Sequence, residues 1–247
     1  MDRMLYLAME GAKQTLRSQS INSNNLANVS TTGFRADLDA VKSLQVYGPG
    51  YEGRVYPSTE SNGSDLSAGT LVSTGRELDF AVKDGDGWIG VQAPDGVSEA
   101  YTRAGDLRFT ESGMLTNGAG HPILGNGGPI VLPPFEKLEI GADGAITILP
   151  VGQDATTMVV ADRIRLVSAD PGQLEKRNDG LMYTRDGINI EPDTSVRVTS
   201  GALESSNVNT VEAMVKMIEL GRKFEMQVKM MKTAQDNDAA SARLLQS

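Results

Sequence analysis

The chain of 247 residues has a net charge of −9, contains no cysteine, and is 39% hydrophobic but only 5% aromatic. An acidic chain without a basic block argues against binding to nucleic acid or to anionic membrane surfaces. Without cysteine there are no disulfides and no thiolate metal sites, and no apolar run approaches the ~20 residues that a membrane-spanning helix needs.

The N-terminal segment, from residue 2 to about residue 28, has the periodicity of a helix. Its apolar residues come alternately four and three residues apart, which is the heptad spacing of helices that pack along a seam. The positions on this stripe are Leu5, Met9, Ala12, Leu16, Gln19, Ser23 and Leu26. The segment lacks the apolar region and small-residue cleavage site of a secretory signal peptide. We therefore expect a helix whose apolar stripe is buried against another element.

This helix runs into the stretch NSNNLANVSTTGFR, residues 22–35. Asn22, Asn25 and Asn28 recur every third residue and share one face of the helix. They are either a fraying helix end, because asparagine is a good terminator, or a register device, because a carboxamide in an apolar seam must find a partner. Thr31, Thr32 and Gly33 are expected to end the helix, and Phe34 is expected to lie beyond it.

The middle of the chain predicts strands. Residues 45–75 are linker-like, with short extended pieces and no long helix. From about residue 75 to 200, apolar and polar residues alternate in short runs, as in Leu78, Phe80 and Val82. Asp-Gly and Asn-Gly dipeptides punctuate these runs and supply the positive φ angles of tight hairpins. Short strands with hairpin turns and no helical pattern between them indicate an antiparallel β domain.

The C-terminal segment carries the stronger helical pattern. Its stripe keeps the three-four rhythm over four heptads and comprises Met214, Met217, Gly221, Phe224, Val228, Met231, Gln235, Asp238, Ala242 and Leu245, widened by Val211, Val215 and Ile218. We expect a helix from about Asn209 to Leu245, ~55 Å long at ~1.5 Å per residue, with Ser206 or Asn207 as its N-cap. Gly221 either lets another backbone approach closely or is a tolerated defect that costs ~1 kcal/mol against alanine.

The expected fold class is therefore α+β, in which the N- and C-terminal helices pair as a coiled-coil stem and an antiparallel all-β domain is inserted between them. The expected divisions are residues 1–35 for the first helix and the joint after it, 36–75 for an extended linker, 76–203 for the β domain and 204–247 for the last helix. Apolar surface that the pairing leaves uncovered is expected to meet neighbouring copies.

Few residues suggest chemistry. GDGWIG has the G-x-G-x-x-G spacing of nucleotide folds, but Trp88 and Ile89 continue it as a strand where that motif needs a helix. Asp84 and Asp86 lack the further ligands of a calcium loop. His121 is the only histidine, and no partner signature points to it as a zinc ligand or a general base. We expect no enzyme activity, no metal and no cofactor.

Four stretches resemble a known family. NNLANVSTTGF (residues 24–34) closely resembles the N-terminal signature of bacterial flagellar axial proteins, the rod and hook family. TGRELDFAVKDGDGWIGVQ and YTRAGDLRFTESGMLTNGAGHPILG look like the central β module of that family. SSNVNTVEAMVKMIELGRKFEMQVKMMKTAQDND resembles its closing helix. The opening MDRMLYLAMEGAKQTL and the RKFEMQVKMMKTA stretch are most similar to its proximal-rod members, and the distal-rod and hook-type members are the alternative.

The resemblance implies a structural role. Such proteins are exported unfolded through the flagellar type III apparatus and assemble beneath the hook into a helical drive shaft, which spans the periplasm in the basal body. The implied partners are copies of the chain, other rod proteins and the export apparatus. Heptad ends that bury their stripes against copies or near relatives give head-to-tail contacts, which build helical tubes. The expected interface residues are Leu5, Met9, Ala12, Leu16, Asn25, Leu26, Asn28, Thr32, Gly33, Phe34, Val211, Val215, Ile218, Gly221, Phe224, Val228 and Met231.

Two other classes of function stay open at the level of the residues. A glycine-rich β domain with acidic turns is compatible with a carbohydrate-binding or hydrolytic module, but that interpretation leaves the two heptad ends unexplained. A soluble coiled-coil adaptor would form a stable dimer in solution, whereas a rod subunit is expected to be a monomer until it meets its neighbours.

Overall fold

The chain forms two compact units. The structure is a computed structural model that describes residues 3–39, 41–45, 55–59, 63–83, 85–152 and 158–245. Unit 1 comprises residues 1–28, 37–63 and 208–247, and unit 2 comprises residues 29–36 and 64–207. The chain therefore crosses between the units four times.

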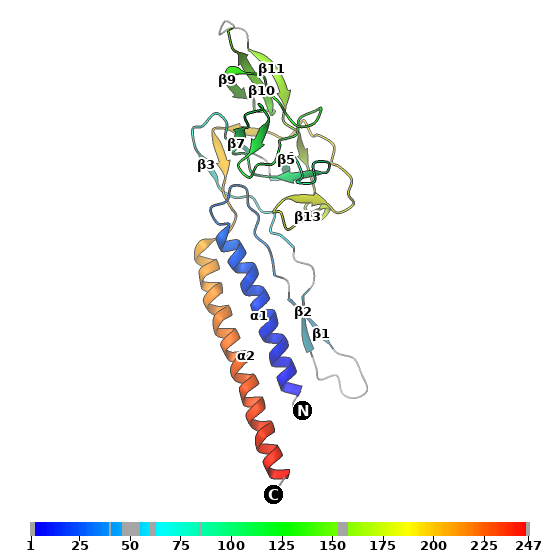
Figure 1. Cartoon of the computed structure of the whole chain (residues 1–247), viewed down its shortest axis with the longest axis vertical. Coiled ribbons are helices and arrows are strands. Elements are labelled where there is room, and N and C mark those ends of the chain that lie inside the picture. Colours follow the sequence, from blue (N-terminus) through cyan, green and yellow to red (C-terminus); the bar gives the residue numbers. More distant parts are fainter. Residues whose placement is uncertain are drawn as a thin grey trace. The chain divides into compact units, whose positions relative to one another are not determined.

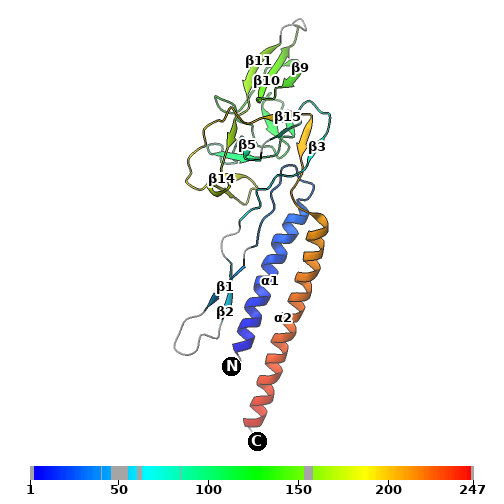
Figure 2. The same ribbon diagram turned by 180° about the vertical axis from the view of Figure 1, so that it is seen from behind.

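Unit 1 consists of two long helices and a hairpin. Helix α1 (Arg3–Ala27) and helix α2 (Thr210–Leu245) lie side by side and run in opposite directions (Figures 1 and 2). Strands β1 (Val41–Gln45) and β2 (Val55–Thr59) pair antiparallel, and β2 lies against α1. The segment expected to be an extended linker thus holds this hairpin in unit 1, and it also contributes strand β3 to unit 2. Residues 40, 46–54 and 60–62 of that segment lie outside the described residues.

The face of α1 that packs on α2 is made of small side chains. Its buried residues are Ala8, Ala12, Thr15, Ser18 and Asn22. Small residues at a contact let two helix axes approach closely. At Gly11, a methyl group would lie 2.8 Å from the Gln227 amide nitrogen.

The matching face of α2 keeps a heptad rhythm. Its buried and half-buried positions, alternately four and three residues apart, are Ala213, Met217, Leu220, Phe224, Gln227, Met231 and Ala234. The inter-helix seam therefore contains Ala213, Gln227 and Ala234, each one residue before a position of the expected stripe (Met214, Val228 and Gln235).

The expected stripes were displaced by one residue on both helices. Leu5, Met9 and Leu16 are exposed, and so are Met214 and Val228. Of the large apolar residues on the expected stripes, Met217, Phe224 and Met231 do lie on the seam. On α1 the physical reason is that a heptad count made on large apolar side chains finds the most apolar face, whereas the buried face is the one whose small side chains allow a close approach.

Unit 2 is built from short antiparallel strands. In chain order they are β3 (Leu71–Ser73), β4 (Phe80–Val82), β5 (Gly87–Gln92), β6 (Glu99–Thr102), β7 (Leu107–Phe109), β8 (Leu115–Asn117), β9 (Phe135–Ile140), β10 (Ala145–Pro150), β11 (Val159–Arg163), β12 (Leu166–Ser168), β13 (Leu174–Lys176), β14 (Met182–Thr184), β15 (Val198–Ser200) and β16 (Ala202–Glu204), with a 3-10 turn η1 (Pro171–Gln173) before β13. The sheets have the orders β12-β5-β6-β14-β13, β11-β10-β9, β15-β4, β16-β3 and β7-β8.

Every strand pair described in the chain is antiparallel. The main core of unit 2 lies between these sheets and includes Phe80, Ile89, Leu107 and Ile146, each fully buried. GDGWIG leads into β5 and forms no helix start. The α+β class and the antiparallel strands of the middle region are thus confirmed.

The small-residue seam is testable in the free protein. Ala8→Leu places a large side chain where Ala8 is buried, and overpacking a close contact costs ~1–3 kcal/mol. We expect it to lower the unfolding temperature of the helices, followed by far-UV circular dichroism. Met9→Leu, one residue away on the exposed face, is the control and should leave that temperature unchanged. Equal stability of the two variants would mean that α1 presents a different face to α2.

Candidate functional site: the joint and the helix faces

The asparagines of the NSNNLANVSTTGFR stretch make specific bonds within unit 1. Asn25 donates from Nδ2 to the Asp37 carbonyl (2.9 Å) and accepts at Oδ1 from the Asp37 N–H (2.8 Å). Its carboxamide thus satisfies both backbone groups of Asp37, as a residue on a paired strand would. Asn22 is buried and donates to the carbonyl of Ala213 on α2 (2.7 Å). Asn28 Nδ2 donates to the Asn24 carbonyl (3.0 Å) at the helix end. A partnered carboxamide on the seam favours the register interpretation for Asn22, whereas Asn28 terminates the helix.

The residues after the helix belong to unit 2 and pack tightly there. Gly33 has a φ of +67°, and its N–H donates to the Glu204 carbonyl (2.8 Å). A Cβ at this position would lie 2.4 Å from the Arg103 carbonyl carbon, so only glycine fits. The Phe34 ring lies 3.9 Å from the Lys176 ammonium, which also donates to the Arg35 carbonyl (2.8 Å). Thr32 is half-buried.

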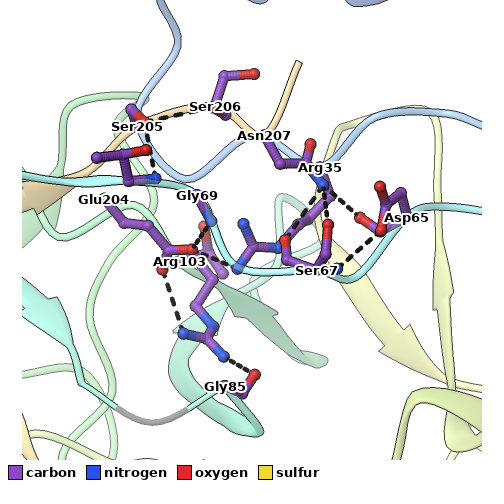
Figure 3. A network of polar contacts seen from close by, with 12 residues as sticks. Arg35, Asp65, Ser67, Gly69, Gly85, Arg103, Glu204, Ser205, Ser206 and Asn207 are labelled. Carbon is purple, nitrogen blue, oxygen red and sulfur yellow. Dashed lines mark hydrogen bonds and ion pairs between the residues drawn. The ribbon is translucent and has the colours of Figure 1, made fainter. Parts of the chain in front are cut away.

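A buried Arg–Glu–Arg cluster lies at the centre of this region (Figure 3). Glu204 accepts from Arg35 Nη2 at Oε1 (2.6 Å), from Arg103 Nη1 at Oε2 (3.2 Å), and from the Gly69 N–H at Oε1 (2.8 Å). The three side chains are no more than 2% exposed. The Glu204 carboxylate, at the end of β16, thus contacts three other parts of the chain. These are the segments around Arg35 and Gly69, and Arg103, which follows β6.

The cluster buries two positive charges with one negative charge. Burial lowers the pKa of the Arg103 guanidinium, and the neighbouring Glu204 carboxylate opposes that shift. Arg103 also donates from Nη2 to the Gly85 carbonyl. In the described part of the chain, Arg35 Nε and Nη1 and Arg103 Nε have no hydrogen-bond partner. Instead both guanidinium groups lie over the Trp88 ring, at 5.7 and 5.0 Å from its centroid, where the π face stabilises a cation.

Asn207 forms a second link between the same segments. Its Oδ1 accepts from the Ala36 N–H (2.8 Å), and its Nδ2 donates to the carbonyls of Asp65 (2.9 Å) and Ser67 (3.2 Å). The prediction that Ser206 or Asn207 caps α2 was wrong. Asn209 caps it, because its Oδ1 accepts from the Val211 and Glu212 N–H groups (3.0 and 3.3 Å).

The expected interface residues on the helices fall into three groups. Ala12, Phe224 and Met231 lie on the seam between α1 and α2, and Leu26 is half-buried. Gly221 is half-buried too, but a methyl group there would meet no described atom within 4 Å, so no backbone of this chain approaches it closely. The exposed members are Leu5, Met9, Leu16, Val211, Val215, Ile218 and Val228.

The described residues form neither a metal site nor a membrane-spanning helix. Among the described residues, no group of three or more His, Asp or Glu side chains is arranged to hold a metal ion. His121 is half-buried, and its backbone N–H donates to Asn117 Oδ1 in a turn. Asp84 lies outside the described residues. No helix that the structure describes is both long and apolar enough to cross a membrane.

Sequence reasoning missed Arg35, Arg103, Glu204 and Asn207 as a connected group. Arg35 and Glu204 are separated by 169 residues, and Arg103 and Glu204 by 101. A charged residue in a chain with 32 acidic side chains carries no local signal of burial. The expectation that Thr31, Thr32 and Gly33 end the helix was wrong, because α1 ends at Ala27 and Gly33 lies six residues beyond it in a turn.

These features define a class of protein: an α+β chain whose paired terminal helices keep exposed apolar faces and whose polar joint is structural. Three family models match it, namely the flagella basal body rod protein (residues 5–35), the flagellar hook protein FlgE/F/G D1 domain (83–148) and the flagellar basal body rod FlgEFG protein C-terminal (199–244).

Full-length relatives give the particular family. The chain is 40% identical to the flagellar basal-body rod protein FlgF of Salmonella typhimurium, over 99% of both chains, and 40% identical to that of Escherichia coli, also over 99% of both. It is 30% identical to the flagellar basal-body rod protein FlgG of Bacillus subtilis, over 95% of this chain and 96% of that one. The chain belongs to the family of flagellar basal-body rod proteins FlgF, which are structural proteins and not enzymes.

Removing the single negative charge of the Arg–Glu–Arg cluster is expected to lower the free energy of unfolding of unit 2 strongly. Glu204→Gln leaves two buried guanidinium groups without a counter-charge, and breaking a buried ion pair in this way costs ~3–5 kcal/mol. We expect a large loss of stability of unit 2 in urea unfolding followed by Trp88 fluorescence. Glu139→Gln is the control, because its partner Lys137 lies on the exposed surface, and it should change little. A Glu204→Gln chain as stable as the control would show that the cluster does not stabilise unit 2.

Gly33 can be compared with a glycine of similar conformation. Gly33→Ala must accept a positive φ, which costs ~1–2 kcal/mol, and also a clash with the Arg103 backbone. Gly75 has a φ of +70°, but a methyl group there would meet no atom within 4 Å. We expect Gly33→Ala to destabilise unit 2 clearly more than Gly75→Ala in the same unfolding experiment. Equal losses would mean that the backbone angle alone demands glycine at position 33.

Proposed function

We propose that this chain is a subunit of the proximal part of the flagellar rod and assembles through its two terminal helices into the shaft that transmits torque to the hook. The observation that carries the proposal is the exposure of large apolar side chains on both helices. Met9 and Leu16 on α1 and Val211, Val215 and Ile218 on α2 are each at least half exposed. Apolar faces of this kind on a protein mark sites of association.

The helix pair supports a coiled-coil stem. The seam on α2 follows the four-three rhythm from Ala213 to Ala234, which is the spacing of knobs-into-holes packing. Because small side chains form the α1 side of this seam, the larger apolar residues of α1 stay exposed and can pack against other subunits. Each helix thus has one face for its partner in the same chain and another for its neighbours in the rod.

The charge distribution also suits side-by-side packing of the helical units. Unit 1 contains 11 acidic and 11 basic residues, whereas unit 2 contains 21 acidic and 12 basic residues and so accounts for the whole net charge of −9. Neutral helical units can pack closely without mutual repulsion, while an excess of one sign on the β units keeps unassembled chains soluble.

The partners that we propose are copies of this chain, other rod proteins and, before assembly, the flagellar type III export apparatus. The proposed parts are the divisions expected from the sequence: stem helices at 1–35 and 204–247, a linker at 36–75 and a β domain at 76–203. Matches to FlgF proteins at 40% identity and to an FlgG protein at 30% favour the proximal rod over the distal rod.

The structural character of the family argues against the carbohydrate-binding or hydrolytic alternative.

The exposed helix faces predict a defect in assembly without a defect in folding. In a strain that lacks this chain, we expect Leu16→Asp and Ile218→Asp to be made but to fail in restoring swimming and complete basal bodies, because a charge would be buried against a neighbour. Ser20→Asp adds the same charge at an exposed polar position of α1 and should restore both. Normal swimming with Leu16→Asp and Ile218→Asp, or complete basal bodies without the chain, would refute the proposal.

A further inference from the structure

The two-stranded sheet β16-β3 has one covered edge and one open edge. On the outer edge of β16, the Glu204 carbonyl accepts from Gly33 N–H (2.8 Å), and the Gly201 N–H beside the strand donates to the Asp79 carbonyl (2.7 Å). Strand β3 pairs with β16 through a register in which Leu71 faces Glu204 and Ser73 faces Ala202. Its other side has no strand neighbour in the described chain.

The hydrogen bonds show which backbone groups of β3 point outward. Ser205 N–H donates to the Thr70 carbonyl (2.9 Å) and Thr74 N–H donates to the Gly201 carbonyl (2.8 Å). Antiparallel strands alternate between bonded and non-bonded pairs, so Thr70, Val72 and Thr74 bond to β16. The N–H and C=O groups of Leu71 and Ser73 therefore face away from β16, ready to pair with another strand.

The composition of this edge is unusual for a strand that stays in water. Residues 66–75, which include β3, contain neither a charged residue nor a proline, and Leu71 and Val72 are 45% and 51% exposed. Soluble proteins normally protect a free edge with charges, proline or a bulge. The edge strands β9 and β13 carry charged residues, and β11 carries Asp162 and Arg163 with a register shift in its pairing to β10.

The chain also offers a complementary segment. Residues 112–135 contain no Asp, Glu, Lys or Arg, and Val131 within them is 60% exposed. Pro129 and Pro133, two residues to either side, have no N–H, so Val131 is the residue here that can both donate and accept outward. Val131 forms an isolated antiparallel bridge with Met114, and its neighbours bond inward: Leu115 N–H donates to Ile130 C=O, and Leu132 N–H donates to Gly113 C=O (both 2.9 Å). By the same alternation, the N–H and C=O of Val131 face outward.

We propose that the outer edge of β3 pairs with the segment around Val131 of a neighbouring copy of this chain. This inference rests on the proposed role as a rod subunit. Neither segment carries a charged side chain around the contact, and each presents outward backbone groups and an exposed apolar side chain. Pairing would therefore join the N–H and C=O of Val131 to the outward groups of β3 and bring apolar side chains into contact. Because the two segments differ, the contact is heterologous and repeats from copy to copy, as a helical assembly requires.

The absence of cysteine allows a direct test, since Leu71→Cys introduces a unique thiol. Basal bodies would be purified from a strain that carries only this variant, and the thiol would be probed with a maleimide and with a thiol-linked photo-crosslinker. We expect at least a tenfold slower maleimide reaction than in the free monomer and a crosslink to the peptide that contains Val131. Val160→Cys, on the protected edge β11 and 61% exposed, is the control and should stay reactive.

The outcomes separate the inference from the proposed function. Basal bodies without the chain would overturn the rod assignment itself. Basal bodies that contain the chain, with Leu71→Cys as reactive as Val160→Cys or crosslinked to a different protein, would overturn only the β3 contact. A solution dimer in which Leu71→Cys is already protected would also overturn it, because β3 would then pair with itself.

A second variant avoids the thiol. Val72→Lys adds a charge to the proposed edge at an exposed position, and Val160→Lys does the same on β11. We expect equal unfolding temperatures for both variants, but swimming reduced severalfold only for Val72→Lys. Equal swimming would contradict the proposal.

Discussion

The ion pairs and hydrogen bonds of the Glu204 carboxylate hold together the segments of unit 2 around Arg35, Gly69 and Arg103. The carboxylate accepts from two buried arginines and from the backbone of Gly69, while the Glu204 carbonyl accepts from Gly33. A buried ion pair adds little net stability compared with an apolar substitute, but it is costly to break and strict in geometry. Such a cluster is therefore suited to specifying one arrangement of several chain segments.

Arg35 and Glu204 of the cluster, together with Asn207, lie close along the sequence to the points where the chain passes between the two units. Arg35, Gly69 and Asn207 all lie within a few residues of points where the chain passes between the two units. Glu204 and Asn207 gather those three segments, so the places where the chain leaves unit 2 are set by polar contacts inside unit 2. For a subunit of a torque-bearing shaft, well-defined exits from the β unit are a mechanical requirement, and hydrogen bonds with fixed directions meet it better than apolar contacts do.

Unit 1 packs its helices through the small side chains of α1 and not, among the described residues, through buried charges. Its two helices must recognise one another within the chain and still retain apolar surface for their neighbours. Alanine, glycine, serine and threonine lie on the inner face of α1, and leucine and methionine on its outer face are exposed; in the assembly proposed above, these exposed residues meet the neighbours. The exposed apolar residues, which would be a liability in a free globular protein, follow from the demands of an assembled structure.

The sequence by itself determined the class and most of the elements. Heptad periodicity located both helices, alternation and Asp-Gly turns indicated antiparallel strands, and NNLANVSTTGF indicated the family, because these signals are local in the chain. Only the tertiary structure decided which helix faces meet, that Asn207 links segments and does not cap α2, and that Arg35, Arg103 and Glu204 form one cluster. Those features depend on residues more than a hundred positions apart and on how closely small side chains allow two backbones to approach, neither of which a local pattern records.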